Sequence, residues 1–179
     1  GYNTCVLIPD GRIIFVPFNA KTIGIYDYTK TSIDMNYGFT TIAIKNPGKY
    51  SGGILLSDGR VLFIPSTNNI IGIYNPNNYI INNSPPGYTT ITLTTLTGQF
   101  SGGVLLPDGN VLFIPFGTNA SSSILNIFNP INNTISTITS KVTMVGNDYY
   151  GATLIKDGRV ICSPYLNTNI GILSGYNTR

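Results

Sequence analysis

The sequence contains no histidine, no glutamate and no tryptophan, and its seven acidic residues are all aspartates. These absences exclude Ser-His-Asp and Cys-His catalysis, and histidine-ligated zinc, copper or iron sites, within these residues. A glycosidase needs two carboxylates that face each other. Only Asp27, Asp34 and Asp148 lie outside a recurrent Asp-Gly motif. We therefore predict a protein that is not an enzyme, with no cofactor and no bound metal.

Charge is scarce as well: 9% of the residues are charged and the formal net charge is +3. Ordinary soluble domains carry about 25% charged residues. The ten basic residues form no cluster, so we predict no nucleic-acid partner. No apolar run approaches the roughly 18–20 residues of a membrane span. The 42% hydrophobic content instead favours a folded core over disorder.

Cysteine is also rare, and two residues, Cys5 and Cys162, exclude a fold built on a disulfide framework. One interpretation is that both thiols are buried as small hydrophobic groups. The alternative is a single bridge between the first and last repeats, which requires these repeats to be neighbours in space.

What the sequence does contain is an internal repeat. The dipeptide Asp-Gly recurs at intervals of 48, 50 and 49 residues, within NTCVLIPDGRIIFVPF, SGGILLSDGRVLFIPS, SGGVLLPDGNVLFIPF and YGATLIKDGRVICSPY. A proline stands seven residues after each aspartate and an aromatic residue eight before it. The aromatic residues are Tyr2, Tyr50, Phe100 and Tyr149. The predicted turn residues are Asp10, Gly11, Asp58, Gly59, Asp108, Gly109, Asp157 and Gly158.

Each repeat predicts a small antiparallel sheet. Asp-Gly between two apolar runs indicates a hairpin with a type I′ turn, in which both central residues have positive φ. Flanking runs such as VLL and VLFI indicate strands that are buried on both faces, and the proline ends the second strand because it has no N–H to donate. A third strand such as IIGIY and a Thr/Ile-rich fourth strand, clearest as YTTITLTTLT, complete the unit.

A small sheet with two buried faces must be covered by sheets like itself, and radial repetition around an axis does this. A repeat near 48 residues fits the blade of a propeller. We predict an all-β chain, a β-propeller domain or part of one, with four-stranded blades at 1–48, 49–98, 99–147 and 148–179. The fourth copy ends after its third strand, which leaves an open sheet edge. Further blades could follow it, two chains could complement each other, or a four-bladed ring could close without that strand.

The pattern G-G-x-L-L-x-D-G-x-V-L-F-I-P, followed by I-x-N-P, resembles kelch-type blades such as those of galactose oxidase. It also resembles a divergent group of kelch-like repeats that includes proteins of large DNA viruses. The resemblance covers essentially the whole chain and implies a propeller, with a virus particle as one setting. The second strand here ends in Ile-Pro, Val-Pro or Ser-Pro where kelch blades have Gly-Gly, and the kelch tryptophan is missing. The copper chemistry of galactose oxidase is not implied, because its histidine ligands have no counterparts.

Propellers usually bind partners on the face made by the loops that enter the first strand and join the second strand to the third. Aromatic residues in these loops can hold sugars or peptides, or they can pack between blades. The candidates are Phe18, Tyr50, Phe100, Phe116, Tyr149 and Tyr165. Those that vary among the copies, Phe116 and Tyr165, are the stronger candidates, together with the long loop from Gly117 to Ser123.

The four hairpin aspartates could form a ring of oxygen ligands for Ca²⁺. Because a hairpin turn selects Asp-Gly anyway, we interpret them as structural. The function we predict is a structural or protein-interaction module that self-associates or binds a protein through its open edge. A lectin-like, glycan-binding propeller and a fragment of a larger propeller enzyme are the alternatives.

Overall fold

The computed structural model describes residues 1–30, 37–45, 48–77, 87–94, 96, 99–116, 122–144 and 149–175. These residues form fifteen β-strands and no helix, so none of them belongs to a helix that could span a membrane. The strands make four separate antiparallel sheets, each with its strands in chain order. Three sheets have four strands and the last has three, which confirms the predicted fold class.

Each sheet is one blade, and blades 1 to 4 follow the chain. Blade 1 consists of β1 (Tyr2–Leu7), β2 (Ile13–Pro17), β3 (Thr22–Tyr26) and β4 (Phe39–Ala43). Blade 2 consists of β5 (Tyr50–Leu55), β6 (Val61–Pro65), β7 (Ile70–Tyr74) and β8 (Tyr88–Thr92). Blade 3 consists of β9 (Gln99–Leu105), β10 (Val111–Phe116), β11 (Ser122–Asn129) and β12 (Thr134–Met144). Blade 4 consists of β13 (Tyr149–Leu154), β14 (Val160–Pro164) and β15 (Gly171–Leu173).

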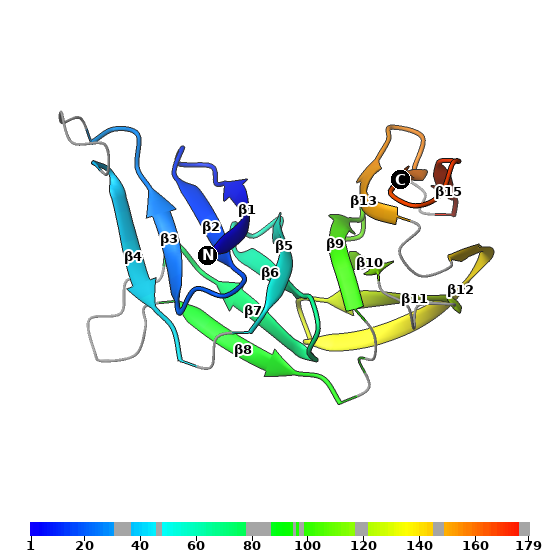
Figure 1. The fold of residues 1–179 in the computed structure, drawn as a ribbon, viewed down its shortest axis with the longest axis horizontal. Helices are drawn as coiled ribbons and strands as arrows, with labels where there is room; N and C mark the ends of the chain where they lie inside the picture. Colours follow the sequence, from blue (N-terminus) through cyan, green and yellow to red (C-terminus); the bar gives the residue numbers. More distant parts are fainter. Residues whose placement is uncertain are drawn as a thin grey trace.

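The blades lie side by side in an open arc (Figure 1). The first strand of each blade lies on the inside of the arc, where β1 contacts β5, β5 contacts β9, and β9 contacts β13. Blades 1 and 4 stand on opposite sides of a gap. The arc is therefore not the sealed four-bladed ring that was one of the three alternatives.

The Asp-Gly motif forms a hairpin in every blade, but the predicted turn type is wrong. In blade 1 the Gly11 N–H donates to the Ile8 carbonyl, and the Ile8 N–H donates to the Arg12 carbonyl. The loop thus has three residues, Pro9 to Gly11, and only its glycine has positive φ (90°). This is a type I turn followed by a left-handed glycine, the usual form of a three-residue hairpin loop. The aspartate keeps ordinary φ and contributes through its side chain, which accepts the Arg12 N–H at 3.0 Å.

The core consists of three interfaces between neighbouring blades, and in each an aliphatic face of one blade packs on the next blade. The receiving face is aromatic-rich in the first two interfaces, whereas in the third Tyr149 is its one buried aromatic residue. Alternating residues of the second and third strands supply the aliphatic face. In the first interface, blade 1 contributes Ile14, Val16, Ile23 and Ile25, and blade 2 contributes Tyr50, Phe63, Tyr74 and Tyr88. In the second, blade 2 contributes Leu62, Ile64, Ile71 and Ile73, and blade 3 contributes Phe100, Phe113 and Phe128. In the third, blade 3 contributes Leu112, Ile114 and Leu125, and blade 4 contributes Tyr149, Cys162 and Leu173.

Glycine lets the first strands approach their neighbours closely. A Cβ on Gly53 would lie 2.7 Å from methyl groups of both Val6 and Val16 in blade 1. A Cβ on Gly103 would lie 2.7 Å from the Ile64 side chain of blade 2. Distances below 3.0 Å leave no room for a side chain, so only glycine fits at these positions.

The two cysteines are both free, and the bridge between them is absent. Cys162 is buried, as one interpretation expected, but Cys5 is exposed. The reason is the position of blade 1 at the end of the arc. Cys5 pairs with Phe15 in the β1–β2 ladder, so its side chain lies on the face that no preceding blade covers.

Candidate binding site

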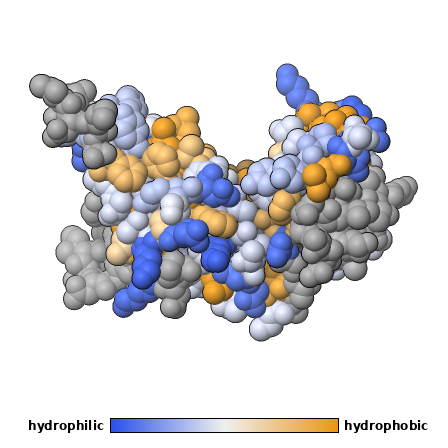
Figure 2. Space-filling model, viewed as in Figure 1, coloured by the Kyte–Doolittle hydropathy of each residue, from blue (hydrophilic) through white to orange (hydrophobic). Residues whose placement is uncertain are grey.

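A groove runs along the inside of the arc and has a volume of about 340 Å³. Its walls come from the first strands of all four blades, which bring small residues together because the strands are closely packed there. The lining residues include Asn3, Ser51, Gly102, Tyr150 and Ala152. The groove corresponds to the concave side of the molecule in Figure 2. Among the residues that line it, the phenol of Tyr150 is the only titratable side chain, so the described lining offers no carboxylate, imidazole or thiol for acid–base or nucleophilic catalysis.

Hydrogen bonds between blades stiffen the walls of the groove. The Asn3 amide donates to the Ser51 carbonyl at 2.8 Å and links blade 1 to blade 2. The Ser101 hydroxyl donates to the Tyr149 carbonyl at 3.5 Å and links blade 3 to blade 4. These contacts hold a surface of backbone and small polar groups in place.

Three aromatic rings cluster at one end of the groove, between blades 3 and 4. Phe116 lies 5.3 Å from Tyr150 and 5.8 Å from Tyr165, and the two tyrosine rings lie 5.5 Å apart, as measured between ring centroids. Tyr150 is 50% exposed and Tyr165 58% exposed. The rings touch one another, so they form an exposed aromatic platform and leave no central space for a ligand. We call Phe116, Tyr150 and Tyr165 the aromatic platform.

The remaining aromatic candidates are not on this platform. Tyr50, Phe100 and Tyr149 are buried at interfaces between blades, where a ligand on the surface cannot reach them. Their placement agrees with the packing interpretation that the sequence left open. Phe18 is half-buried in blade 1, at the other end of the arc from the platform.

Several residues considered above lie outside the described residues. They are Asp34, Asp148 and positions 117–121 of the long loop. Ser122 and Ser123 are placed in β11. Asp27, the remaining carboxylate outside the Asp-Gly motif, is half-buried in the loop after β3 and accepts hydrogen bonds from the Thr29 backbone and hydroxyl at 3.0 and 2.6 Å.

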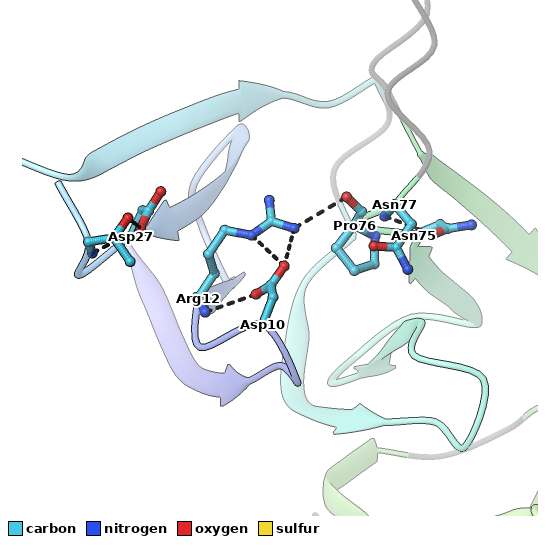
Figure 3. A network of polar contacts seen from close by, with 7 residues as sticks. Asp10, Arg12, Asp27, Asn75, Pro76 and Asn77 are labelled. Atoms are coloured by element: carbon cyan, nitrogen blue, oxygen red, sulfur yellow. Dashed lines mark hydrogen bonds and ion pairs between the residues drawn. The ribbon is translucent and has the colours of Figure 1, made fainter.

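Two hairpin arginines reach from one blade to the next. The Arg12 guanidinium binds the Asp10 carboxylate of its own hairpin at 2.6 Å, and its Nη2 also lies 3.4 Å from the carbonyl of Pro76 in blade 2 (Figure 3). Arg60 repeats this arrangement one blade later and donates to the Pro130 carbonyl of blade 3 at 3.0 Å. We call this arrangement the arginine clasp.

Three of the hairpin carboxylates, those of Asp10, Asp58 and Asp157, thus each form an ion pair with the arginine of the same hairpin. The hydrogen bond from Arg12 lowers the pKa of Asp10, and the hydrogen bonds from Arg60 and Arg159 do the same for Asp58 and Asp157. Each of these aspartates also caps its own turn. Within the described part of the chain, no three residues among His, Cys, Asp and Glu lie close enough to hold a metal ion together.

The two ends of the arc expose apolar side chains that the other blades bury. On blade 1 the aromatic-rich face is uncovered, with Tyr26 and Phe39 exposed and Phe15 half-buried. On blade 4 the aliphatic face is uncovered, with Ile172 40% exposed and Ile170 57% exposed. Hydrophobic surface is visible on both arms of the arc in Figure 2. We call these surfaces the blade 1 face and the blade 4 face.

The chain matches no protein-family model and no curated protein. It is similar in structure to streptogramin B lyase, with a TM-score of 0.70 at 18% identity over 95% of this chain and 49% of that one. It is also similar to virginiamycin B lyase from Staphylococcus aureus, in a catalytically inactive histidine-to-alanine variant with quinupristin. There the TM-score is 0.64 at 14% identity, over 94% of this chain and 53% of that one.

A third similar structure is the β-propeller domain of Cps50 (Swd1) from Myceliophteria thermophila, with a TM-score of 0.66 at 11% identity over 97% of this chain and 51% of that domain. Taken with the four radially arranged sheets, these similarities show that the chain has the β-propeller fold. The chain spans about half the length of each of these structures.

Sequence reasoning missed Tyr150 and the two uncovered faces. Tyr150 occupies the position of Asn3, Ser51 and Ser101 in the other repeats, so its departure from small polar residues was a usable signal. The faces carried a signal too, since the positions four and five residues after each hairpin aspartate are aliphatic and mostly aromatic, respectively. The repeat pattern did not show in which blades these faces lack a neighbouring blade that covers them.

Proposed function

We propose that this chain is a non-catalytic part of a β-propeller that acts as a structural or protein-interaction module and binds protein through its two end faces. The observation that carries this proposal is the exposure of apolar side chains on these faces. Phe63 and Phe113 are fully buried, whereas Phe15 at the equivalent position is not. Exposed apolar patches of this kind mark sites of protein association. Among the described residues, the three-stranded blade 4 also has an unpaired strand edge.

The available chemistry supports a non-catalytic role. The groove lining offers no catalytic base, and a histidine-to-alanine variant of virginiamycin B lyase is described as catalytically inactive, whereas this chain has no histidine. The alternative of an enzyme fragment would need catalytic residues from blades beyond this chain. Sequencing of the complete gene separates the two possibilities. The resemblance of the repeat to kelch-like proteins of large DNA viruses supports a virus particle as the setting.

The experiment is affinity purification of the tagged protein from its native source. We expect the wild type to recover a protein in stoichiometric amount, a second copy included. The Ile172→Lys variant should lose this protein, because the lysine places a charge in the blade 4 face. Ile131→Lys is the matched control, since Ile131 is 87% exposed in a loop of blade 3 and away from both faces. Recovery that is equal for the two variants, or no recovery at all, would refute the proposal.

A second candidate function, glycan binding, rests on the aromatic platform. Exposed tyrosine rings can pack against the apolar face of a sugar, and hydroxyl and amide groups such as those of Ser51 and Asn3 line the adjacent groove. We expect weak glycan binding on an array, which Tyr165→Ala abolishes. Tyr28→Ala is the control, because Tyr28 is similarly exposed in blade 1. A blank array would rule out this candidate.

A further inference from the structure

We propose that the protein bound at the end faces is a second copy of this chain, joined head to tail, with the blade 4 face of one copy packed on the blade 1 face of the next. This inference rests on the proposed function and names its partner. Two independent features of the structure support it: the two faces are complementary in chemistry, and each carries one half of an unfinished arginine clasp.

The faces complement each other because each repeats a surface that the chain already uses. Ile161, Ile170 and Ile172 on blade 4 occupy the positions of Ile14, Ile23 and Ile25. These are three of the four aliphatic residues that blade 1 packs against blade 2, and Ser163 stands at the position of the fourth, Val16. On blade 1, in turn, Tyr2, Phe15, Tyr26 and Phe39 occupy the positions of Tyr50, Phe63, Tyr74 and Tyr88. A head-to-tail contact between two copies would therefore be a fourth example of the interface seen three times within one chain.

The blade 1 face is already organised for such a contact. Tyr2, Phe15 and Phe39 form a cluster with ring centroids 5.6 to 6.2 Å apart. The Tyr2 hydroxyl is held by that of Thr22 at 2.8 Å. In blade 2 the equivalent cluster of Tyr50, Phe63 and Tyr88 is the buried surface that receives blade 1.

The arginine clasp supplies the second argument. An arginine stands two residues after the hairpin aspartate in blades 1 and 2, and in both cases the next blade presents an Asn-Pro turn after its third strand. Blade 3 has Asn110 instead, whose amide binds Asp108 of its own hairpin at 2.7 Å. The next blade, blade 4, has Ser174-Gly175 in place of Asn-Pro. The arginine is thus present where the following blade offers the turn, and absent where it does not.

Blade 4 has the arginine again, and the described residues contain no blade to receive it. Arg159 binds the Asp157 carboxylate at 2.6 Å, as the other clasp arginines bind theirs. The blade that would receive it in a second copy is blade 1, whose equivalent turn is Asp27-Tyr28. The Asp27 side chain accepts the N–H two residues on, as Asn75 and Asn129 do in their turns.

Charge further favours this pairing. Asp27 is a carboxylate where blades 2 and 3 have the neutral Asn75 and Asn129. Its hydrogen bonds from Thr29 lower its pKa, so it is ionised at neutral pH. A carboxylate at this turn faces the incoming guanidinium of Arg159, and opposite charges at the rim of an interface fix its orientation.

The size of related propellers fits two copies. The chain covers 49% to 53% of the length of the lyase and Swd1 structures. A head-to-tail contact between different surfaces forms a closed ring when the rotation per copy completes a full circle. Two copies supply about the length of one such structure, so we infer a closed dimer with two identical junctions.

The test is a charge exchange between two variants, monitored by native mass spectrometry and analytical ultracentrifugation. The wild type should form a species of twice 19.3 kDa. Arg159→Asp and Asp27→Arg each place like charges at both junctions, and each should raise the dissociation constant at least about tenfold. When the two variants are mixed, opposite charges face each other at both junctions, and heterodimers should form with near wild-type affinity.

Controls make each result decisive. Ile172→Lys should also abolish the dimer, whereas Ile131→Lys should leave it unchanged, and circular dichroism checks that every variant is folded. A wild type that stays monomeric at about 100 µM, where micromolar affinity would give mostly dimer, overturns the inference. So does a mixture of the charge variants that fails to associate. If the wild type is monomeric but recovers a different protein that Ile172→Lys loses, the second copy is refuted and the interaction function stands.

Discussion

The hydroxyl oxygens of Tyr50 and Tyr88 lie 2.6 Å apart, in a hydrogen bond buried between blades 1 and 2. The Tyr50 ring also lies over Gly72, where a Cβ would approach its hydroxyl oxygen to 2.9 Å. Glycine at this position therefore makes room for the tyrosine, and Tyr88 from the fourth strand satisfies its hydroxyl. The recurrent aromatic residue in each repeat thus joins the first strand to the rest of its blade.

From this bond we expect Tyr50→Phe to lower the free energy of unfolding by about 1–3 kcal/mol, because a buried hydroxyl on Tyr88 would lose its partner. Replacing both tyrosines with phenylalanine should cost less than the sum of the two single changes. Urea unfolding of the four proteins gives the coupling energy. Additive costs would show that the two hydroxyls are not coupled.

Adjacent glycines of β9 should respond differently to alanine. A Cβ on Gly103 would lie 2.7 Å from the Leu112 carbonyl oxygen, whereas a Cβ on Gly102 has no neighbour within 4 Å. We expect Gly103→Ala to lower the unfolding free energy by about 1–3 kcal/mol. Gly102→Ala should leave it unchanged or raise it by a few tenths, because it restricts the unfolded chain. Thermal melts of the two variants measure this difference, and equal melting temperatures would contradict the close approach.

The arginine clasp should contribute measurably to stability. Arg60 joins its own hairpin to the Pro130 carbonyl of the next blade, whereas Asn110 at the equivalent position binds Asp108 of its own hairpin. We expect Arg60→Ala to cost about 1 kcal/mol, a value kept modest by its partial exposure. Asn110→Ala should cost less than half as much. Denaturant unfolding compares the two, and a larger cost for Asn110→Ala would argue against the clasp.

Stability should fall in alkaline solution because of Cys162. Burial raises the pKa of this thiol to about 11, from an ordinary value of 9.0. A group whose pKa is raised on folding stabilises the protein below its unfolded pKa, and this contribution is lost as pH rises through the folded value. The unfolding free energy should therefore fall between pH 9 and pH 11.

The matched variant is Cys162→Ala, which removes the titrating thiol. It should be less stable at neutral pH because it leaves a cavity, but its stability should change less between about pH 9 and about pH 10. Burial also raises the pKa of Tyr50 and Tyr88 above the ordinary 10.0, so both proteins should lose stability at higher pH. Identical slopes for the wild type and the variant would show that Cys162 does not contribute.

Particular residues show where prediction from sequence ended. The in-phase aspartates and prolines located the hairpins and the second strands, because turn geometry and the missing proline N–H act within a few residues. The same pattern did not give the turn type. The loop between β1 and β2 has three residues, and only Gly11 adopts the left-handed conformation. This turn type depends on the register in which β1 and β2 pair, and the Asp-Gly dipeptide alone does not fix that register. Tyr50 and Phe100 were candidates for ligand contact from their recurrence, and only burial showed that they pack between blades.

The order of amino acids by itself determined four similar sheets with two apolar faces, since strand periodicity and turn chemistry are local properties of the chain. Only the tertiary structure decided which of these faces find a neighbour. Covering a face depends on contacts between residues some fifty positions apart, and at the ends of the arc the described residues hold no such neighbour. For that reason Phe15 and Ile172 are accessible while their counterparts Phe63 and Ile73 are buried.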